Sequence, residues 1–212
     1  MLRDVRAFTH LSRFTRNDQG LAMIEFALIL PLLISVFYGV VELTRFILMQ
    51  QKLDNATHTI VDVINQNLGL TNADLEGISE SLPAMVAPYD AGGWGVIISS
   101  VQSSDGTPIK YSKDPDRYCG AGAVGTPITL WQRIYGSPGG SSRVSSGQCN
   151  AATLPDLSLQ PREQVIAVEV YLKYKPVING DVIRNMLGLD EQGIYKVSFA
   201  RPRYGTFEFE PK

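Results

Sequence analysis

The chain has 212 residues and carries 19 Lys and Arg against 21 Asp and Glu, a formal net charge of −2. This near-neutral balance, without a basic block, argues against a nucleic-acid-binding protein. The chain contains two cysteines and two histidines, which excludes a multi-cysteine zinc framework and leaves little for histidine chemistry. The length suits one folded domain with appendages.

Residues 21–41 form an apolar run whose single charged side chain at neutral pH is Glu25. A helix of this length spans about 30 Å, the thickness of the bilayer hydrocarbon. The alternative is a buried helix of a soluble protein, but a chain of this size is too small to surround one on all sides. The run also exceeds the apolar core of a signal peptide, and no small-residue cleavage site follows it. We therefore expect a membrane anchor that stays in the mature protein.

Basic residues are concentrated before this run. The first 20 residues contain four arginines, whereas the 20 residues after Val41 contain one arginine and one lysine. The positive-inside rule then places the N-terminus in the cytoplasm and everything after Val41 across the membrane.

The stretch from Gly20 to Phe26 resembles the processing site of type IV pilin-like precursors. In that group a basic leader ends in Gly, a prepilin peptidase cuts after it, and Glu occupies the fifth mature position. By this resemblance the leader is residues 1–20, with a net charge of +2 from four arginines and two aspartates, and the cut falls between Gly20 and Leu21. We also expect Gly20 to break the helix just before the apolar run, which would leave the peptide accessible.

Glu25 is the anomaly of the apolar run, because a carboxylate there costs roughly 2.5–3.5 kcal/mol on insertion scales. One interpretation is that Glu25 lies shallow enough to reach headgroup water. The other is that it pairs with the new α-amino group of Leu21, on its own chain or on a neighbour. Such a pair would favour one axial register between packed helices, although desolvation offsets much of the attraction. The resemblance implies a role for Glu25 in assembly and not in catalysis.

Within this group the chain is most similar to the TadE-like proteins of tight-adherence (Tad) pilus systems. Those typically combine a basic leader, a G-x-x-x-x-E-F/Y-A-L-x-x-P core and a following E-L-x-R. The matching positions here are Gly20, Glu25, Phe26, Ala27, Leu28, Pro31, Glu42, Leu43 and Arg45, and residues 201–204 also resemble the end of that family.

The resemblance implies a minor pilin or pseudopilin that supports pilus biogenesis and surface adhesion, with no enzymatic activity and no cofactor. The implied partners are a prepilin peptidase, other pilins or pseudopilins, and the Tad inner-membrane platform proteins. The implied location is the bacterial inner membrane, with the C-terminal domain in the periplasm. Pro31 has two readings, a kink used in assembly or a proline that the membrane helix tolerates.

Beyond the membrane the helix is predicted to continue as a stem over residues 42–69, giving one helix over residues 21–68. Apolar residues recur there at three- and four-residue spacing, and Gly69 sits where a C-terminal cap is expected. The stripe is Phe46, Met49, Leu53, Ala56, Ile60, Ile64 and Leu68. It must pack either on the protein's own sheet, which we favour, or on the stem of a neighbouring subunit.

Residues 70–212 are predicted to form an α+β domain. A short helix capped by Thr71 or Asn72 should include Leu75, Ile78 and Leu82, with Pro83 near its end. Period-two patterns predict strands at 95–102, 128–135, 165–174 and 194–201, with a short strand at 108–111 and a helical turn at 181–187. One apolar and one mixed face indicate an antiparallel sheet of four to five strands, covered on one side by helices.

Cys119 and Cys149 flank one predicted strand and a Gly- and Ser-rich loop at residues 136–147, which should be flexible. Because disulfides persist in the periplasm, we expect a bridge between them, which by chain-entropy arithmetic contributes roughly 3–4 kcal/mol.

Signals of other functions are weak. Gly120, Gly122 and Gly125 have the spacing of a dinucleotide-binding loop but lack the flanking strand and helix. Aspartates at 105, 114 and 116 suit local turns better than a cation site. Two alternatives to the pilin-like interpretation stay open: an unprocessed, membrane-anchored periplasmic binding or sensor domain, and an enzyme whose cleft would lie in the sheet domain.

Overall fold

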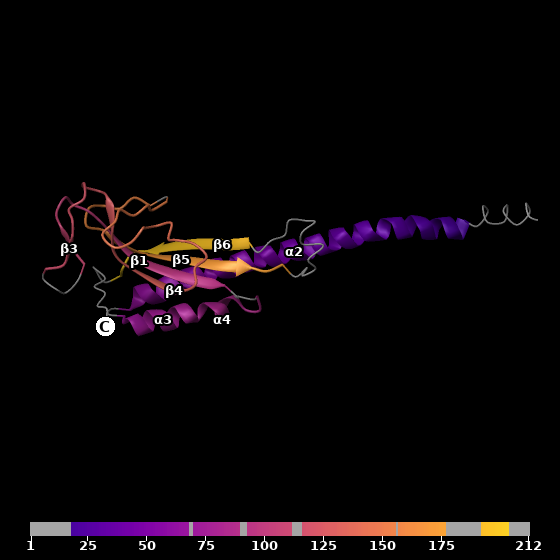
Figure 1. Cartoon of the computed structure of the whole chain (residues 1–212), viewed down its shortest axis with the longest axis horizontal. Coiled ribbons are helices and arrows are strands. Elements are labelled where there is room, and N and C mark those ends of the chain that lie inside the picture. The colour runs from indigo at the N-terminus through magenta and orange to yellow at the C-terminus, as the bar shows by residue number, and fades with distance from the viewer. Residues whose placement is uncertain are drawn as a thin grey trace, which may run out of the picture. The chain divides into compact units, whose positions relative to one another are not determined.

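The computed structural model describes residues 18–67, 70–89, 93–111, 116–155, 157–176 and 192–203. The chain divides into two compact units that meet between Arg45 and Phe46. The longest element, α2 (Asp18–Gln66), begins in the first unit and ends in the second (Figure 1). The described part of the first unit is helix alone, whereas the second holds the rest of α2 and the sheet domain.

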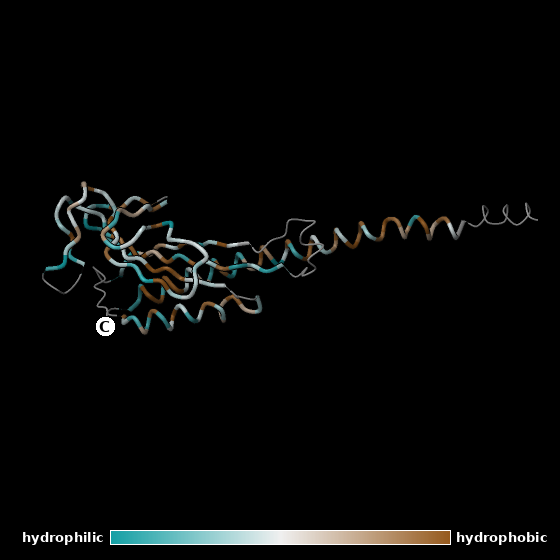
Figure 2. The backbone as a smooth tube through the Cα atoms, viewed as in Figure 1, coloured by the Kyte–Doolittle hydropathy of each residue, from teal (hydrophilic) through white to brown (hydrophobic). Residues whose placement is uncertain are grey.

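In the first unit, α2 presents large apolar side chains on all sides. Leu21, Phe26 and Leu28 are 61%, 60% and 75% exposed, and Figure 2 shows hydrophobic residues along this stretch. Among the described residues, α2 is the one helix that is long and apolar enough to cross a membrane, by length and composition. A helix that is apolar all round needs an apolar environment such as lipid or other helices.

The helix begins earlier than expected. Because α2 starts at Asp18, the prediction that Gly20 breaks the helix just before the apolar run is wrong. Gly20 lies within α2. The strong helix that follows can propagate through a glycine at modest entropic cost. Pro31 also lies within α2, which continues past it.

In the second unit, α2 buries one face. Met49, Leu53, Ile60 and Ile64 have no exposed surface, and they share one apolar core with residues of the sheet. The predicted stripe is thereby confirmed, and it packs on the protein's own sheet. Leu68 and Gly69, the expected last stripe residue and cap, lie outside the described residues.

The predicted second helix is two helices. α3 (Asn72–Glu80) has Thr71 as its N-cap, in a capping box with Asp74, which confirms the predicted start. The helix is interrupted at Ser81, and α4 (Leu82–Val86) follows with Pro83 in its first turn. Pro83 therefore opens a helix and does not lie at the end of one, because its ring blocks a continuous helix upstream but suits a first turn.

The sheet has four strands in the order β4-β1-β5-β6, and all neighbours are antiparallel. Their bounds are β1 (Trp94–Ser103), β4 (Pro127–Gly136), β5 (Gln164–Tyr174) and β6 (Gln192–Ala200), which confirm the four predicted long strands. A second, two-stranded sheet pairs β2 (Ile109–Lys110) with β3 (Tyr118–Cys119). The α+β class is confirmed, and the helical turn expected at 181–187 lies outside the described residues.

Alternate side chains of β5 lie on opposite faces of the sheet and belong to different apolar clusters. Ile166, Val168 and Leu172 belong to the core shared with α2, α3 and α4. Val165 and Ala167 belong to a second apolar cluster on the opposite face. This opposite face is covered by the long connection between β4 and β5, which contributes Val144, Ala152, Leu154, Leu157 and Leu159 to the cluster.

The expectation of a sheet covered on one side is therefore incomplete. On β6, the apolar residues Val197 and Phe199 turn toward the β4–β5 connection, while Lys196 and Ser198 turn toward α2. The reason lies in register: Ser198 pairs with Val168, so it shares the helix-covered face. A connection of this length supplies apolar side chains that period-two patterns cannot reveal.

Candidate functional site

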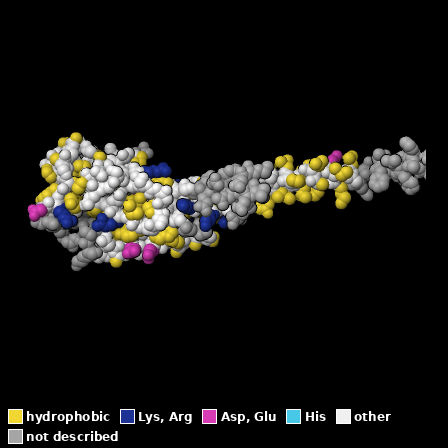
Figure 3. Space-filling view, in the orientation of Figure 1, with side chains coloured by type: hydrophobic (Ala, Val, Ile, Leu, Met, Phe, Trp, Pro, Cys, Tyr) yellow, Lys and Arg dark blue, Asp and Glu magenta, His cyan; other side chains and the backbone are white. Residues whose placement is uncertain are grey.

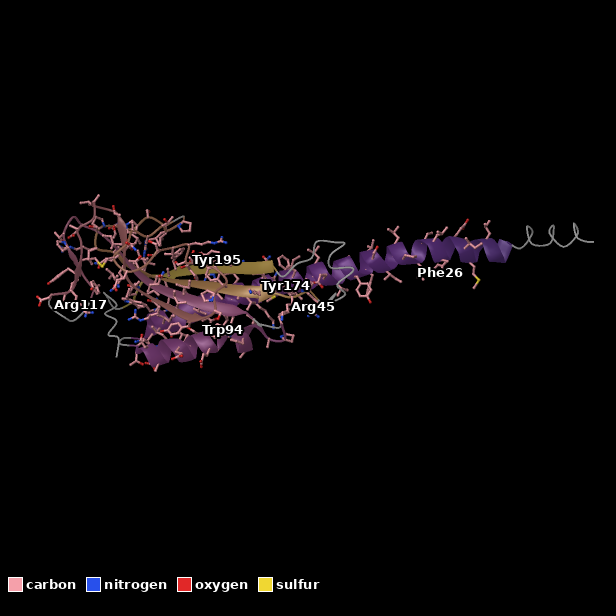
Figure 4. All side chains as sticks on the ribbon, viewed as in Figure 1. Phe26, Arg45, Trp94, Arg117, Tyr174 and Tyr195 are labelled. Atoms are coloured by element: carbon pink, nitrogen blue, oxygen red, sulfur yellow. A yellow bond between two sulfur atoms is a disulfide. The ribbon has the colours of Figure 1, made fainter. Side chains whose placement is uncertain are left out.

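The residues predicted to act in processing and assembly lie together on α2. Gly20, Leu21, Glu25, Phe26 and Pro31 all belong to the first unit, and Glu25 is exposed. Phe26 projects from the helix (Figure 4), and Figure 3 shows hydrophobic side chains along this part of α2. Because Glu25 is the one acid between Leu21 and Val41, any partner that buries this segment must also accommodate a carboxylate.

Glu25 and Leu21 lie four residues apart on the same face of α2. Helical side chains point back toward the N-terminus, so the carboxylate of Glu25 is directed toward the turn that holds Leu21. An α-amino group at position 21 would lie about one turn away, roughly 6 Å along the axis. This geometry suits attraction within one chain and, equally, between parallel helices in contact.

The two cysteines form a disulfide, with an S–S distance of 2.09 Å and a Cα–Cα distance of 5.1 Å. Cys119 is buried at the end of β3, and Cys149 lies beside the outer edge of β4. There the N–H of Cys149 donates to the carbonyl of Thr129 over 2.7 Å, and the N–H of Thr129 donates to the carbonyl of Asn150 over 2.9 Å. The bridge and these bonds attach the β4–β5 connection to an edge strand.

A buried acid that was not predicted from the sequence organises the loop-covered face. Glu169, on β5, has no exposed surface. Its Oε1 accepts from the N–H of Arg143 over 2.7 Å and of Val144 over 3.3 Å, and its Oε2 accepts from the hydroxyl of Ser142. An ionised carboxylate requires such donors when it is buried. The one signal in the sequence was an acid in the middle of a strand rich in valine and other apolar residues.

Two tyrosines complete the network. The hydroxyl of Tyr195, on β6, donates to Oε1 of Glu169 over 3.0 Å, and the Tyr171 hydroxyl lies 3.5 Å from the same oxygen and 2.8 Å from the carbonyl of Ser141. Burial, followed by the Glu169 charge, raises the pKa of Tyr195 above its usual value, and the same causes raise that of Tyr171. Both hydroxyls therefore remain donors throughout the physiological range.

The loop at residues 136–147 is fixed more firmly than predicted. It has no helix, as expected, but Val144 is buried and Ser142, Arg143 and Val144 all bind Glu169. Ser145 adds an isolated bridge to Ala152. A Gly- and Ser-rich composition predicts flexibility, but it cannot reveal a buried acceptor contributed by a strand more than 20 residues away.

A groove of about 500 Å³ lies between this loop and the adjoining ends of β5 and β6. Its lining includes Gly139, Gly140, Arg143, Tyr171, Lys173 and Tyr195. The guanidinium of Arg143 lies over the Tyr195 ring, 4.3 Å from its centroid, and Tyr195 is on β6 (Figure 4). With Glu169 sealed beneath the loop, the exposed charges of the groove are the two cations.

Asp54, His58 and Ser198 have the composition of a catalytic triad. The Nδ1 of His58 lies 2.8 Å from the Ser198 hydroxyl, and its Nε2 lies 4.0 Å from Asp54. Ser198, however, is 4% exposed beneath α2, and Asp54 also pairs with Lys196 over 3.6 Å. A nucleophile must reach its substrate, so these residues act as a polar link between α2 and β6.

The acidic turn residues have local partners. Asp105 accepts from Thr107, through both the hydroxyl and the backbone N–H, and from Arg162, and these hydrogen bonds lower its pKa to about 2. Asp114 lies outside the described residues. Within the described ranges, no three His, Cys, Asp or Glu side chains are grouped so that they could hold a metal ion.

Residues 20–62 match the model of a protein family described as TadE-like protein. The match includes Gly20, Leu21, Glu25, Phe26 and Pro31 and extends through most of the stem part of α2. No curated protein and no solved structure matches the chain.

Proposed function

We propose that this chain, whose residues 20–62 match the TadE-like family model, is a minor pilin or pseudopilin of a Tad pilus system that supports assembly of the pilus and surface adhesion. One observation carries the proposal: the matched segment begins with a helical stretch, residues 21–41, that is apolar on every side and has Glu25 as its one acid. Such a helix suits residence in a membrane followed by packing among like helices.

Processing is the first step of the proposed mechanism. A prepilin peptidase would cut the bond between Gly20 and Leu21 and remove the basic leader at residues 1–20. That bond lies within α2, so the peptidase must unwind the helix locally to reach it. Glycine lowers the cost of unwinding, because it gains more backbone freedom than any other residue.

Assembly is the second step. The cut leaves an α-amino group on Leu21, about one helical turn from Glu25. When apolar helices pack together, a Glu25 carboxylate from one subunit can pair with the amine of its neighbour. A misregistered neighbour would leave both charges buried and unpaired, which is strongly unfavourable. The pair therefore selects one axial offset between subunits.

The proposed topology places the N-terminus in the cytoplasm of a bacterium, residues 21–41 in the inner membrane and the sheet domain in the periplasm. The disulfide suits that oxidising compartment. Other pilins or pseudopilins and the Tad inner-membrane platform proteins are the proposed partners. The sheet domain would supply contacts at the pilus.

The test is replacement of Glu25 in cells that make the pilus. Glu25→Ala should leave membrane insertion and cleavage intact but abolish or strongly reduce piliation, and Glu25→Gln should do the same because an amide cannot form the ion pair. Leu32→Ala, on the same exposed stretch of α2, is the matched control, and cells with this variant should assemble pili normally. Normal piliation of both Glu25 variants would overturn the proposed role of this residue.

The groove beside β5 and β6 favours a second candidate, an unprocessed membrane-anchored binding or sensor domain. In that case the leader would remain attached and Glu25 would be dispensable. The N-terminal sequence of the protein extracted from membranes separates the two candidates.

A further inference from the structure

Exposed charges of opposite sign lie on the two sides of the sheet domain, in the groove and on α3. On the loop-covered face, the groove between residues 139–143 and the ends of β5 and β6 holds the exposed cations Arg143 and Lys173. On the helix-covered face, α3 exposes Glu76 and Glu80, and Figure 3 shows acidic side chains gathered over α3. We propose that the groove of one copy binds the α3 helix of a second copy.

The acidic side chains of α3 lack compensation within the fold. Glu76 and Glu80 are one turn apart on the solvent side, opposite the buried Leu75 and Ser79. Within the described part of the chain, neither glutamate forms an ion pair or a side-chain hydrogen bond. Glu80 also lies in the last turn of α3, which contains no basic residue, so the helix dipole opposes its charge. A cationic partner would relieve both effects.

The cations of the groove are similarly placed. Neither Arg143 nor Lys173 forms an ion pair with any described residue, while Arg201, Arg162 and Lys196 each have an acidic partner. Glu169 holds the backbone of Arg143 by a 2.7 Å hydrogen bond, and the Tyr195 ring holds its guanidinium. The cationic side of the groove is therefore pre-formed, which lowers the entropic cost of binding.

Both surfaces contain glycines. The exposed face of α3 includes Gly77, and a Cβ added at this glycine would meet no atom within 4 Å. The groove includes Gly139 and Gly140 among its walls. The proposed contact brings the two glutamates of α3, one turn apart, to the two cations of the groove.

The symmetry of this contact has a direct consequence. Because α3 and the groove are different surfaces on opposite faces of the sheet, the contact is heterologous and leaves a free α3 at one end and a free groove at the other. It therefore builds rings or open chains of copies and not two-fold dimers. This interface is distinct from the pairing of Glu25 and does not depend on it.

The test uses the full chain in liposomes of neutral phosphatidylcholine. The protein is cross-linked with a carbodiimide, a zero-length reagent that joins a lysine to a carboxylate in contact with it. An equal mixture of ¹⁴N- and ¹⁵N-labelled protein identifies links between copies by mass spectrometry. We expect mixed-isotope links from Lys173 to Glu76 or Glu80, with products larger than dimers. They should persist in the Glu25→Ala variant, which separates this interface from the proposed role of Glu25.

Charge reversal then tests the pairing, with Lys173 kept as the reporter. Arg143→Glu should lower the yield of the Lys173 link at least fivefold. Two double variants then combine Arg143→Glu with either Glu76→Lys or Glu80→Lys. In one of the two, the link from Lys173 to the remaining glutamate should return. Lys110→Glu, an exposed lysine on β2, is the control with the same charge change and should have no effect. Absence of mixed-isotope links, products that stop at the dimer, or an unchanged yield in a folded Arg143→Glu variant would each overturn the proposal.

Discussion

The hydroxyl of Tyr195 donates a 3.0 Å hydrogen bond to the carboxylate of Glu169, which has no exposed surface. The same oxygen of Glu169 accepts from the backbone of Arg143. One acid on a central strand thus joins the edge strand β6 to the β4–β5 connection. The arrangement explains how a Gly- and Ser-rich loop can present a defined surface on a sheet that needs cover on both faces.

Glu169→Gln should destabilise the sheet domain by about 1–3 kcal/mol, because an amide replaces an acceptor with a donor among groups that already donate. Chemical denaturation of the detergent-solubilised protein, followed by near-UV circular dichroism, measures this change. Glu163→Gln is the matched control, since Glu163 is partly exposed where it pairs with Arg201, and it should cost well under half as much. Equal losses in the two variants would mean that Glu169 has no special role.

Leu53→Ala should cost about 2–5 kcal/mol, because Leu53 has no exposed surface in the core between α2 and the sheet. Leu48→Ala, five residues earlier on the same helix, should change the free energy of unfolding by less than about 0.5 kcal/mol, because Leu48 is 45% exposed. If the Leu48 variant unfolds as easily as the Leu53 variant, the burial pattern of the stem is wrong. A Leu48 variant that folds normally but fails to assemble would identify a stem–stem contact.

Loss of the disulfide should cost roughly 3–4 kcal/mol, as chain-entropy arithmetic gives for a loop closed over 30 residues. Cys149→Ala and the double variant of Cys119 and Cys149 should lose nearly the same amount, since either change breaks the bridge. Denaturation with and without a reductant provides the measurement. A wild-type protein whose stability is indifferent to reductant would contradict this account of the bridge.

Asp105 should make stability depend on pH in the acid range. Hydrogen bonds from Thr107 and Arg162 lower its pKa in the folded protein from 3.8 to about 2. Because the folded pKa is the lower one, the contribution is fully present above about pH 4 and is lost as the pH falls through about 2. Asp105→Asn should therefore flatten the fall in the denaturation midpoint between these values. An unchanged slope, compared with an Asp62→Asn control, would remove Asp105 from the acid response.

Sequence patterns predicted the elements whose periodicity is local. The spacing of Met49, Leu53, Ile60 and Ile64 predicted the buried face of α2, and alternation predicted both faces of β5. The family resemblance rested on a short ordered motif around Glu25, and the match over residues 20–62 confirms it. Two predictions were wrong for local reasons: Gly20 was expected to break the helix but lies within α2, and Pro83 was placed near the end of a helix but lies in the first turn of α4.

The features that escaped prediction depend on contacts between distant segments. Glu169 reaches residues 142–144 across the fold, and the groove combines that loop with the ends of β5 and β6. The apolar cluster under the β4–β5 connection comes from isolated residues such as Val144 and Leu157, which follow no period. A pattern of spacings within one segment contains no information on such contacts.

The most direct test of the account is the N-terminal sequence of the protein extracted from membranes of cells with and without the prepilin peptidase. We predict that the chain begins at Leu21 when the peptidase is present and retains residues 1–20 when it is absent. A chain that keeps its leader in both strains would contradict processing at Gly20 and, with it, the proposed pairing of Glu25 with a new amino terminus.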